Sequence, residues 1–177
     1  MNLRRLKLED LDQYRYWKLP QHKYHSLNGP YFKKDSVEEV DAYIQCLKKD
    51  LANNKSVLEN KRIIANDEGK IIGEVSWYWR SQETNWLEIG IVIFDEAFWG
   101  MGIGYSALKL WIEEVFNQKE EIVRIGLSTW AGNHGMIKLA KKLGLKEEAR
   151  YRNARIVNGE YFDSVSYGIL KTEWKSN

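Results

Sequence analysis

Residues 86–116, WLEIGIVIFDEAFWGMGIGYSALKLWIEEVF, decide the fold of this chain. The stretch opens with an apolar run, Leu87 to Phe94, that predicts a buried strand. After three closely spaced glycines, apolar residues recur three and four positions apart, which predicts an amphipathic helix. The apolar stripe of that helix consists of Ile103, Ala107, Leu108, Trp111, Ile112, Val115 and Phe116.

The glycine-rich turn between this strand and helix is the first candidate binding site. Strand, turn and helix in this order place several backbone N–H groups at a helix N-terminus, where the helix dipole favours an anion. Glycine lets that backbone approach a ligand closely, because no Cβ intervenes. The turn therefore predicts a phosphate-binding site, and a glycine turn that only packs the helix on the sheet is the alternative.

Two common phosphate motifs do not fit the turn. A P-loop needs a lysine after its last glycine, but Gly104 is followed by Tyr105 and Ser106. A dinucleotide fingerprint needs a third glycine where Tyr105 stands. A nucleotide-dependent oxidoreductase is therefore excluded.

Composition sets the limits for the rest of the chain. The 177 residues predict one domain, over residues 1–177, with a core of its own. Hydrophobic content of 44% and charged content of 29% are typical of globular proteins. With 27 basic and 25 acidic residues, the net charge of +2 gives no reason to expect nucleic-acid or membrane binding.

Cysteine and histidine are scarce. The single Cys46 excludes an internal disulfide and a cysteine-based metal cluster, and three histidines leave few ligands for a zinc site. We expect no metal. No signal-like segment opens the sequence and no run of 18 apolar residues occurs, so a cytoplasmic location is expected.

The order of predicted elements gives the fold class. Ser36 and Glu39 form a capping box that begins a helix with a clear apolar stripe, and Gly144 ends another. The order is a strand over 2–7, helices over 8–17 and 37–51, strands over 61–66, 71–79 and 87–94, a helix over 103–116, a strand over 122–129, a helix over 136–143, and strands over 145–150, 155–157 and 161–170. This alternation predicts an α/β (α+β) domain with a mixed central sheet.

Three motifs in order carry a resemblance to a known family. The segment 99–104, WGMGIG, closely resembles the acetyl-CoA loop of the GNAT superfamily of N-acyltransferases, where Trp99 replaces the usual Gln or Arg. Asn133, the segment 142–145 (KLGL, with Leu145 in place of Phe) and Glu147 match its second motif. The tail, NGEYFD at 158–163, then YGIL at 167–170 and EW at 173–174, is similar to the RimJ/RimL branch.

The resemblance spans roughly the whole chain and implies a site. In this family the central sheet is mostly antiparallel, helices flank it, and its fourth and fifth strands splay apart. The pantetheine arm of acetyl-CoA lies in that wedge, and its pyrophosphate rests on the glycine loop. The implied acetyl-CoA-binding residues are Ile91, Val92, Ile93, Trp99, Gly100, Met101, Gly102, Ile103, Gly104, Tyr105 and Asn133.

The chemistry that the resemblance implies is direct attack of an amine on the thioester. The amine must be neutral to attack, yet an α-amino group has a pKa of about 7.7–8.0 and a lysine amine about 10.4. A base therefore helps, and an amide of the fourth strand can hold the oxyanion. Glu88, two residues before Gly90 on that strand, is the candidate base, and a carboxylate that is only solvated or salt-bridged is the alternative.

The general acid of the reaction has no evident candidate. Family members place a Tyr seven residues, or a Ser three residues, after the motif Asn, but here these positions hold Ala140 and Met136. His134 and Tyr161 are possible substitutes.

Aromatic side chains are the candidates for acceptor binding. Trp77, Tyr78 and Trp79 follow one another, so their rings point to both faces of one strand. They either pack on two sides of a central strand or line a groove. The predicted acceptor-binding residues are Trp77, Trp79 and Trp130.

The resulting hypothesis is an acetyl-CoA-dependent N-acetyltransferase that acts on a primary amine. The RimJ/RimL resemblance favours the α-amine of a protein or peptide, of the ribosomal-protein type, and a small amine is the other class of acceptor. Related enzymes that acetylate polycations would favour an acidic pocket, and no acidic bias is visible here. The competing hypothesis is an acyl-CoA-binding regulatory module without catalysis. A homodimer is typical of the family.

Overall fold

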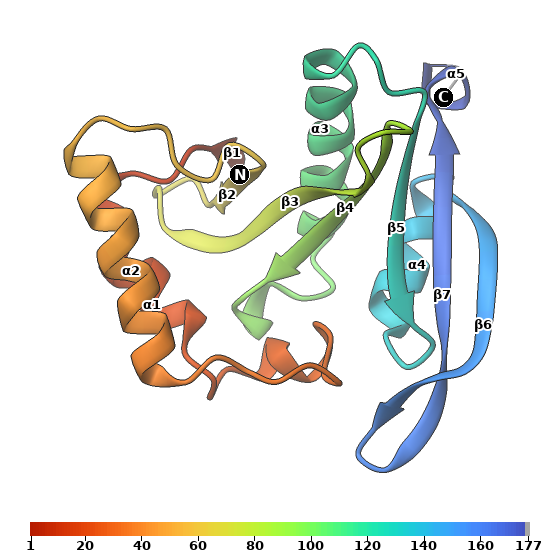
Figure 1. Ribbon diagram of the computed structural model, residues 1–177, viewed down its shortest axis with the longest axis horizontal. Coiled ribbons are helices and arrows are strands. Elements are labelled where there is room, and N and C mark those ends of the chain that lie inside the picture. Colours follow the sequence, from red (N-terminus) through yellow and green to blue (C-terminus); the bar gives the residue numbers. More distant parts are fainter. Residues whose placement is uncertain (176–177) are drawn as a thin grey trace.

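The computed structural model describes residues 1–175 and forms a twisted sheet with helices on both sides (Figure 1). Its elements in chain order are β1 (Asn2–Arg4), η1 (Leu8–Asp10), α1 (Leu11–Lys18), η2 (Lys23–Ser26), α2 (Val37–Ala52), β2 (Lys61–Ala65), β3 (Ile71–Ser81), β4 (Trp86–Ile93), η3 (Glu96–Phe98), α3 (Ile103–Gln118), β5 (Arg124–Trp130), α4 (His134–Lys142), β6 (Lys146–Val157), β7 (Glu160–Leu170) and α5 (Lys171–Lys175).

The described strands form one sheet of seven, in the order β1-β2-β3-β4-β5-β7-β6. All neighbouring strands are antiparallel except β4 and β5, which run parallel. These two are joined by only two residue pairs, Leu87–Ile125 and Glu88–Gly126. The sheet is therefore mixed and mostly antiparallel, and its fourth and fifth strands splay apart, as the sequence predicted.

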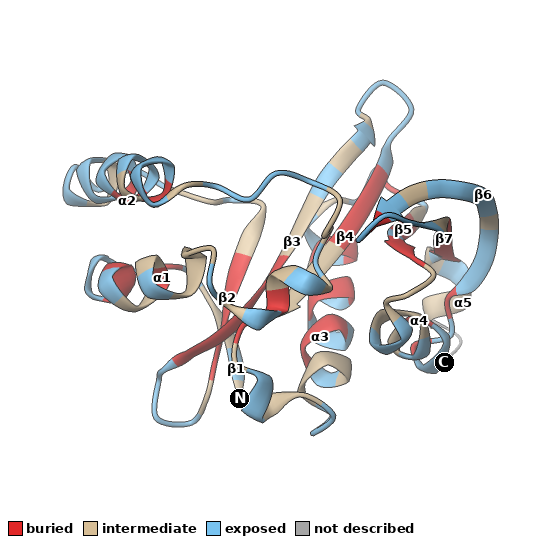
Figure 2. Ribbon diagram, turned by 90° about the horizontal axis from the view of Figure 1, so that it is seen from below, coloured by how far each residue is buried: buried red, intermediate tan, exposed pale blue. Residues whose placement is uncertain are grey.

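The core lies on both faces of the sheet. One buried cluster includes Trp111 and Leu108 of α3 and Ala140 of α4, and the other includes Tyr14 of α1 and Ile44 of α2. The neighbouring residues Ile63 and Ile64 of β2 belong to different clusters, because successive side chains of a strand point to opposite faces. Figure 2 shows the buried strands lying between α1 and α2 on one side and α3 and α4 on the other.

Local signals place several element boundaries where the sequence predicted them. Ser36 accepts a hydrogen bond from the Glu39 amide, and the Glu39 carboxylate accepts one from the Ser36 amide, which completes the predicted capping box of α2. Gly144 follows α4 with a φ of +82°. Left-handed backbone of this kind is the usual end of a helix, because glycine adopts it without strain.

The structure corrects one part of the predicted strand order. The two strands expected at 145–150 and 155–157 are a single strand, β6, whose register against β7 shifts between Tyr151 and Arg155. Asn153 lies in this shift with a φ of +53°, and its amide donates to Asp163 Oδ1 at 3.1 Å. The extra residues form a bulge rather than a break.

The segment between α1 and α2 is the part of the fold that bears most on the site. It carries η2 and passes below the end of β4 toward the end of β5 (Figure 1). Among residues 1–175, no helix has the length and apolar character needed to cross a membrane.

Candidate active site

A wedge opens between β4 and β5 beyond the pair Glu88–Gly126. From Ile89 to Ile93, β4 pairs with β3 on one edge, and its other edge faces the wedge without a partner strand in the described residues. Backbone N–H and C=O groups on such an edge need a partner, because an unpaired polar group away from water is costly. An extended ligand with amide groups can supply that partner.

The wedge contains a cavity of about 240 Å³. Its lining comes from η2 and the residues after it, from β4, from the turn before α3, and from the start of α4. The lining residues are Tyr24, Leu27, Asn28, Ile91, Val92, Ile93, Phe98, Trp99, Gly100, Gly104, Asn133, Gly135, Met136 and Leu139. None of them is charged at neutral pH, so the cavity fits a long, mostly apolar arm.

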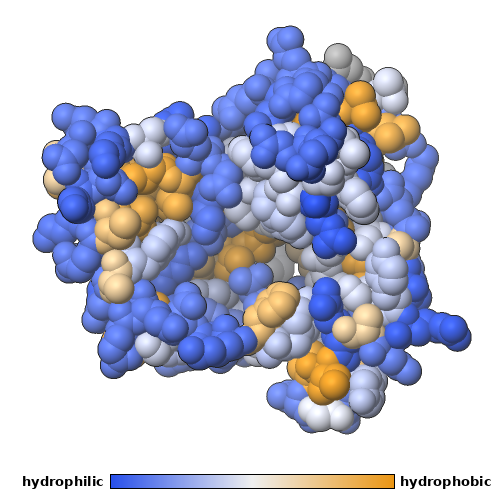
Figure 3. All heavy atoms as spheres, in the orientation of Figure 1, coloured by the Kyte–Doolittle hydropathy of each residue, from blue (hydrophilic) through white to orange (hydrophobic). Residues whose placement is uncertain are grey.

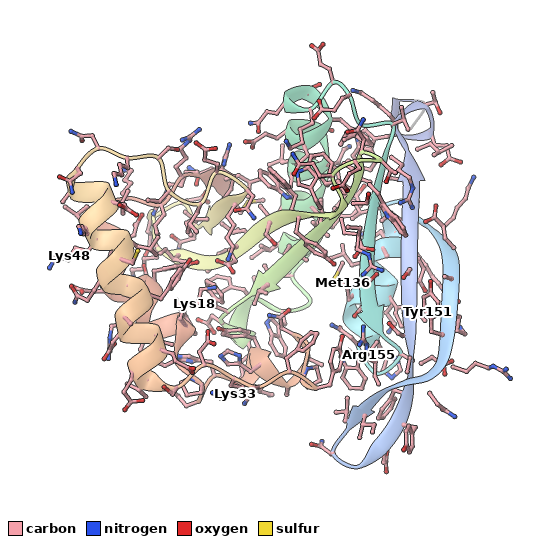
Figure 4. The ribbon with its side chains drawn as sticks, viewed as in Figure 1. Lys18, Lys33, Lys48, Met136, Tyr151 and Arg155 are labelled. Carbon is pink, nitrogen blue, oxygen red and sulfur yellow. The ribbon has the colours of Figure 1, made fainter. Side chains whose placement is uncertain are left out.

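The figures show the same hollow. Figure 3 shows it near the centre of the molecule, with hydrophobic residues at its base. The labelled Met136 lies beside β5 at the gap toward β4 (Figure 4), in agreement with its place in the cavity lining.

The N-terminus of α3 borders this cavity and is open to an anion. Its N-cap residue, Gly102, has a φ of +81° and makes no side-chain capping bond. The Ser106 backbone amide donates to the Gly102 carbonyl at 3.2 Å and makes the first helical hydrogen bond. The amides of Ile103, Gly104 and Tyr105 precede this bond. These amides and the helix dipole have the geometry and the partial charge that suit an anion such as a phosphate group.

The turn before α3 is held in place by Trp99. Its indole N–H donates to the Ile93 carbonyl at 3.0 Å, so the turn folds back on the end of β4. At Gly100 and Gly102 an added Cβ would meet no atom within 4 Å, but both residues have positive φ, of +76° and +81°. Glycine is therefore required here by the backbone conformation.

Glu88 lies at the closed end of the wedge. Its side chain is 3% exposed, and it accepts hydrogen bonds from the Tyr78 hydroxyl at 2.5 Å and from Ser128 Oγ at 3.0 Å. Arg80 Nε lies 3.7 Å away. Burial raises the pKa of Tyr78, and the hydrogen bond to Glu88 raises this pKa further. The phenol therefore stays a donor at neutral pH.

The position of Glu88 fits a base that works through an intermediary. It lies on the face of the sheet that carries Ser128 and Ser166, whose hydroxyls are 2.9 Å apart. Glu88 is not part of the cavity lining. Within the site, Tyr78 connects it to the surface, because this tyrosine is 45% exposed.

Asn133 has a different environment from the one that the sequence suggested. Its Oδ1 accepts from the Met136 amide at 3.0 Å and caps α4, and its Nδ2 donates to the Leu27 carbonyl at 3.2 Å. Asn133 does line the cavity. However, both ends of its side chain are bonded to the protein itself, so a bond to pantetheine would have to replace or share one of these.

The other predicted site residues divide into two groups. Ile91, Val92, Ile93, Trp99, Gly100 and Gly104 line the cavity with Asn133. Met101 is 67% exposed, and Tyr105 contacts Lys142, whose Nζ lies 4.7 Å from the ring centroid. Gly102 and Ile103 begin α3 without lining the cavity.

His134 and Tyr161 lie outside the cavity. His134 is exposed at the first position of α4, and Tyr161 is 64% exposed near the turn between β6 and β7. Along β7 the ring of Phe162 packs on Trp130, so Tyr161 points to the other face. The structure therefore does not bring either candidate acid to the wedge.

The predicted acceptor-binding tryptophans are separated by the sheet. Trp77 and Trp79 pack against the α3 cluster beneath Lys119, whose Nζ lies 4.2 Å and 5.0 Å from their ring centroids. They face away from Glu88, so their placement does not support a role in acceptor binding. Trp130 is buried at the mouth of the wedge, and its indole N–H donates to the Leu27 carbonyl at 3.1 Å.

Sequence reasoning missed the residues that close the wedge. Tyr24, Leu27 and Asn28 line the cavity from the segment between α1 and α2, about a hundred residues before α4. Tyr78 and Ser128 were also missed as partners of Glu88. The sequence signals in segment 22–32 were a turn, clustered aromatic residues, and His22 and His25 as a candidate substrate-facing lip, with solvated loop residues as the alternative. None of these signals indicates which residues the segment contacts.

Comparison with known proteins agrees with this geometry. Residues 1–146 match the model of the family described as the acetyltransferase (GNAT) domain. A Bacillus subtilis protein named "Putative ribosomal N-acetyltransferase YdaF" is 32% identical over 108 residues, which are 61% of this chain and 58% of that relative. The match thus covers somewhat more than half the length of each protein.

Solved structures share the fold at lower identity. The spermidine N-acetyltransferase of Vibrio cholerae, in complex with CoA and spermine, superposes with a TM-score of 0.76 at 18% identity, over 98% of this chain and 97% of that one. A GNAT-family acetyltransferase from Bacillus anthracis superposes with a TM-score of 0.71 at 16% identity, over 97% of this chain and 95% of that one. At these identities the likeness concerns the fold.

A sheet that parts over an open, glycine-rich helix N-terminus suits an extended, phosphate-bearing ligand that lies between two strands. With a family model matched over residues 1–146, this chain belongs to the GNAT acetyltransferase family.

Proposed function

We propose that this protein is an acetyl-CoA-dependent N-acetyltransferase acting on primary amines. The observation that carries the proposal is the parting of β4 and β5 beyond Glu88–Gly126, beside the uncapped N-terminus of α3. The cavity between them has an uncharged lining, and its floor is an unpaired strand edge. These features suit the three parts of the donor: pyrophosphate, amide-bearing arm and thioester.

The proposed binding mode assigns each feature to one part of acetyl-CoA. The amides from Met101 to Tyr105 hold the pyrophosphate, and the backbone of Ile91 and Ile93 pairs with the pantetheine amides. The apolar side chains of Met136 and Leu139 line the cavity opposite β4. The thioester would then lie toward the closed end of the wedge, near Glu88.

The reaction needs a base and an oxyanion site. Acetyl-CoA supplies a thioester carbonyl; the new C–N bond forms as the C–S bond breaks, and the sulfur leaves as a thiolate. A backbone N–H of β4 would hold the developing oxyanion. Glu88 would accept the proton that the amine loses, through Tyr78 or a water molecule, since it lies too deep to touch the acceptor directly.

For the acceptor we propose the α-amine of a protein or peptide, as in the RimJ/RimL branch. The named B. subtilis relative and the tail motif support this branch. A polyamine acceptor is less well supported, because the likeness to the spermidine N-acetyltransferase is one of fold, at 18% identity. A small amine with one charge is the remaining alternative.

A second candidate function has one observation in its favour. Ala140 and Met136 stand where family members place an acid, and neither His134 nor Tyr161 lies in the cavity. A protein with this site could bind acyl-CoA without turning it over. Binding and turnover therefore need separate measurements.

The test is mass spectrometry of a panel of acceptors incubated with acetyl-CoA. The panel contains N-terminal peptides of ribosomal proteins, spermidine and simple primary amines. We expect one added acetyl group on α-amino peptides, with little on spermidine. Calorimetric binding of acetyl-CoA without acetylation of any acceptor would instead favour the binding module, and absence of binding would contradict both functions.

Other sequence-based expectations are retained as proposals. They are a single domain over residues 1–177, a homodimer and a cytoplasmic location. The two buried clusters on one continuous sheet support the first of these.

A further inference from the structure

We infer that Trp130 and Asn133 are positioning residues that hold the segment after η2 across the open wedge by binding the carbonyl of Leu27. The inference rests on the proposed function, because it assigns to this segment the task of closing the donor-binding cavity. It also departs from the role that the motif Asn has in the sequence-based prediction.

Three donors converge on the Leu27 carbonyl oxygen. Trp130 Nε1 lies at 3.1 Å, Asn133 Nδ2 at 3.2 Å, and the Gly29 amide, within the same segment, at 3.2 Å. The first two reach it from β5 and from the N-terminus of α4, 103 and 106 residues further along the chain. These two side-chain donors fix the position of the Leu27 carbonyl relative to β5 and α4, because a partly buried polar group keeps its hydrogen-bond partners.

Asn133 is suited to this task by its two-ended amide. Its oxygen accepts from the Met136 amide, which fixes the side chain as the N-cap of α4. Its nitrogen is thereby directed at Leu27. The side chain thus couples the start of α4, which lines the cavity through Gly135 and Met136, to the opposite wall.

Trp130 is braced for the same contact. Its ring packs edge-on against Phe162 of β7, with centroids 4.9 Å apart. At Gly132 an ideal Cβ would lie 1.9 Å from the Trp130 ring, so the ring occupies space that only glycine leaves free. The indole N–H therefore has one well-defined direction.

The start of the segment, at Lys23, contacts residues that follow β4. Lys23 Nζ lies 2.6 Å from Glu96 Oε2 and 5.8 Å from the centroid of the Trp99 ring. This ion pair is exposed at both partners, so it contributes little stability by itself. The segment nonetheless bridges the two parted strands, and the partly buried hydrogen bonds at Leu27 are the stronger of its two attachments.

The segment that carries Tyr24, Leu27 and Asn28 forms one wall of the cavity. Tyr24 is kept in place by a bond from its hydroxyl to the Trp17 carbonyl at 2.7 Å. If the Leu27 carbonyl loses its side-chain donors, the wall loses its hydrogen bonds to β5 and α4, whereas Tyr24 stays bonded to Trp17 and packed on Phe94. We expect the wall to open more often and the donor to bind more weakly.

The test removes the two donors while keeping their other contacts. Trp130→Phe deletes the indole N–H and retains a ring against Phe162. Asn133→Ser retains an oxygen that can cap α4 and deletes the amide donor. The matched controls are Trp86→Phe, at an exposed tryptophan, and Asn53→Ser, which removes an Asn-to-backbone bond at the end of α2.

Hydrogen exchange of the free protein is the first readout. We expect amides in residues 23–32 to exchange about fivefold faster in each single variant and more than tenfold faster in the double variant. The controls should leave this segment unchanged. Exchange within twofold of wild type in the double variant, with α4 still protected, would overturn the inference.

Donor affinity is the second readout. Calorimetry with CoA should give a Kd about three- to tenfold higher for the double variant than for wild type. An unchanged CoA affinity would also overturn the inference. Neither measurement requires turnover, so a protein that acetylates no amine would contradict the proposed function while leaving this test intact.

Discussion

Gly126 on β5 lies opposite Glu88 on β4, and an ideal Cβ at Gly126 would lie 3.3 Å from the Cγ of Glu88. The absence of a side chain leaves room for the carboxylate over β5, where it reaches Ser128 Oγ. These two residues are also the last pair before the strands part. The candidate base is thus held at the point where the wedge begins.

Glu88→Gln tests the base. The base matters most when the amine is protonated, so turnover should fall most at pH 6 and least above the pKa of an α-amine, about 7.7–8.0. The measurement is the steady-state kcat/KM of the wild type divided by that of the variant, at each pH from 6 to 9. A ratio that stays constant over this range would show that Glu88 is not the base. Tyr78→Phe is the companion variant, because it keeps the carboxylate and removes its donor.

Gly102→Val tests the phosphate site. A branched side chain at a φ of +81° strains the backbone and turns the first amides of α3 away from the ligand. We expect acetyl-CoA to bind at least about tenfold more weakly, or about 1.4 kcal/mol. Gly69→Val is a matched control, since Gly69 has the same φ of +81° and also has no atom near an added Cβ. Wild-type affinity of a folded Gly102→Val protein would contradict this site.

Gly104→Val tests the packing beside the same site. An ideal Cβ at Gly104 would lie 3.3 Å from Leu139 Cδ2 and 4.0 Å from Ile91 Cδ1, both residues of the cavity lining. The larger side chain would narrow the cavity and weaken acetyl-CoA binding by about tenfold or more. Calorimetry on the variant checks this, with the melting temperature as a control for folding.

His134→Ala and Tyr161→Phe test whether the reaction needs a dedicated acid. With a thiol pKa of about 8.5, loss of the thiolate near pH 7 costs about 2 kcal/mol, or roughly thirtyfold in rate. Positioning and an oxyanion site can outweigh a loss of this size. Because both residues lie outside the cavity, each change should lower kcat less than about tenfold. A hundredfold loss from either, with acetyl-CoA binding intact, would identify an acid.

The buried carboxylate of Glu74 predicts how stability depends on pH. It accepts from the Tyr14 hydroxyl and from Lys18 Nζ, both at 2.7 Å, and Lys61 Nζ lies at 3.4 Å. Burial alone would raise the pKa of Glu74, but the charges of Lys18 and Lys61 outweigh it and lower the pKa to about 2. The folded protein thus binds this proton more weakly than the unfolded chain does.

Glu74→Gln should therefore destabilise the protein above pH 4.5 and progressively less toward pH 2. At pH 7 the loss should be about 3 kcal/mol of unfolding free energy, measured by urea denaturation. Glu68→Gln, at an exposed ion pair with Lys70, is the control and should change little. A Glu74→Gln effect that stays the same from pH 7 to pH 3 would show that the ionised pair is not its source.

Local sequence determined most of the elements and the open, glycine-rich N-terminus of α3. The apolar stripe of α3, the capping box at Ser36 and the helix end at Gly144 depend on residues within one or two turns. The glycines before α3 likewise act through the backbone of their own turn. For this reason the strand, turn and helix at 86–116, and most of the residues by which they border the cavity, could be predicted from the sequence.

Tertiary structure alone decided which side chains face the wedge. Trp77 and Trp79 alternate with Tyr78 in the sequence, but only the placement of α3 sends their rings to the face away from Glu88. Asn133 caps a local helix, yet its other bond goes to Leu27, which is brought there by the path between α1 and α2. Contacts between residues a hundred positions apart depend on how the whole sheet packs, and no local pattern records them.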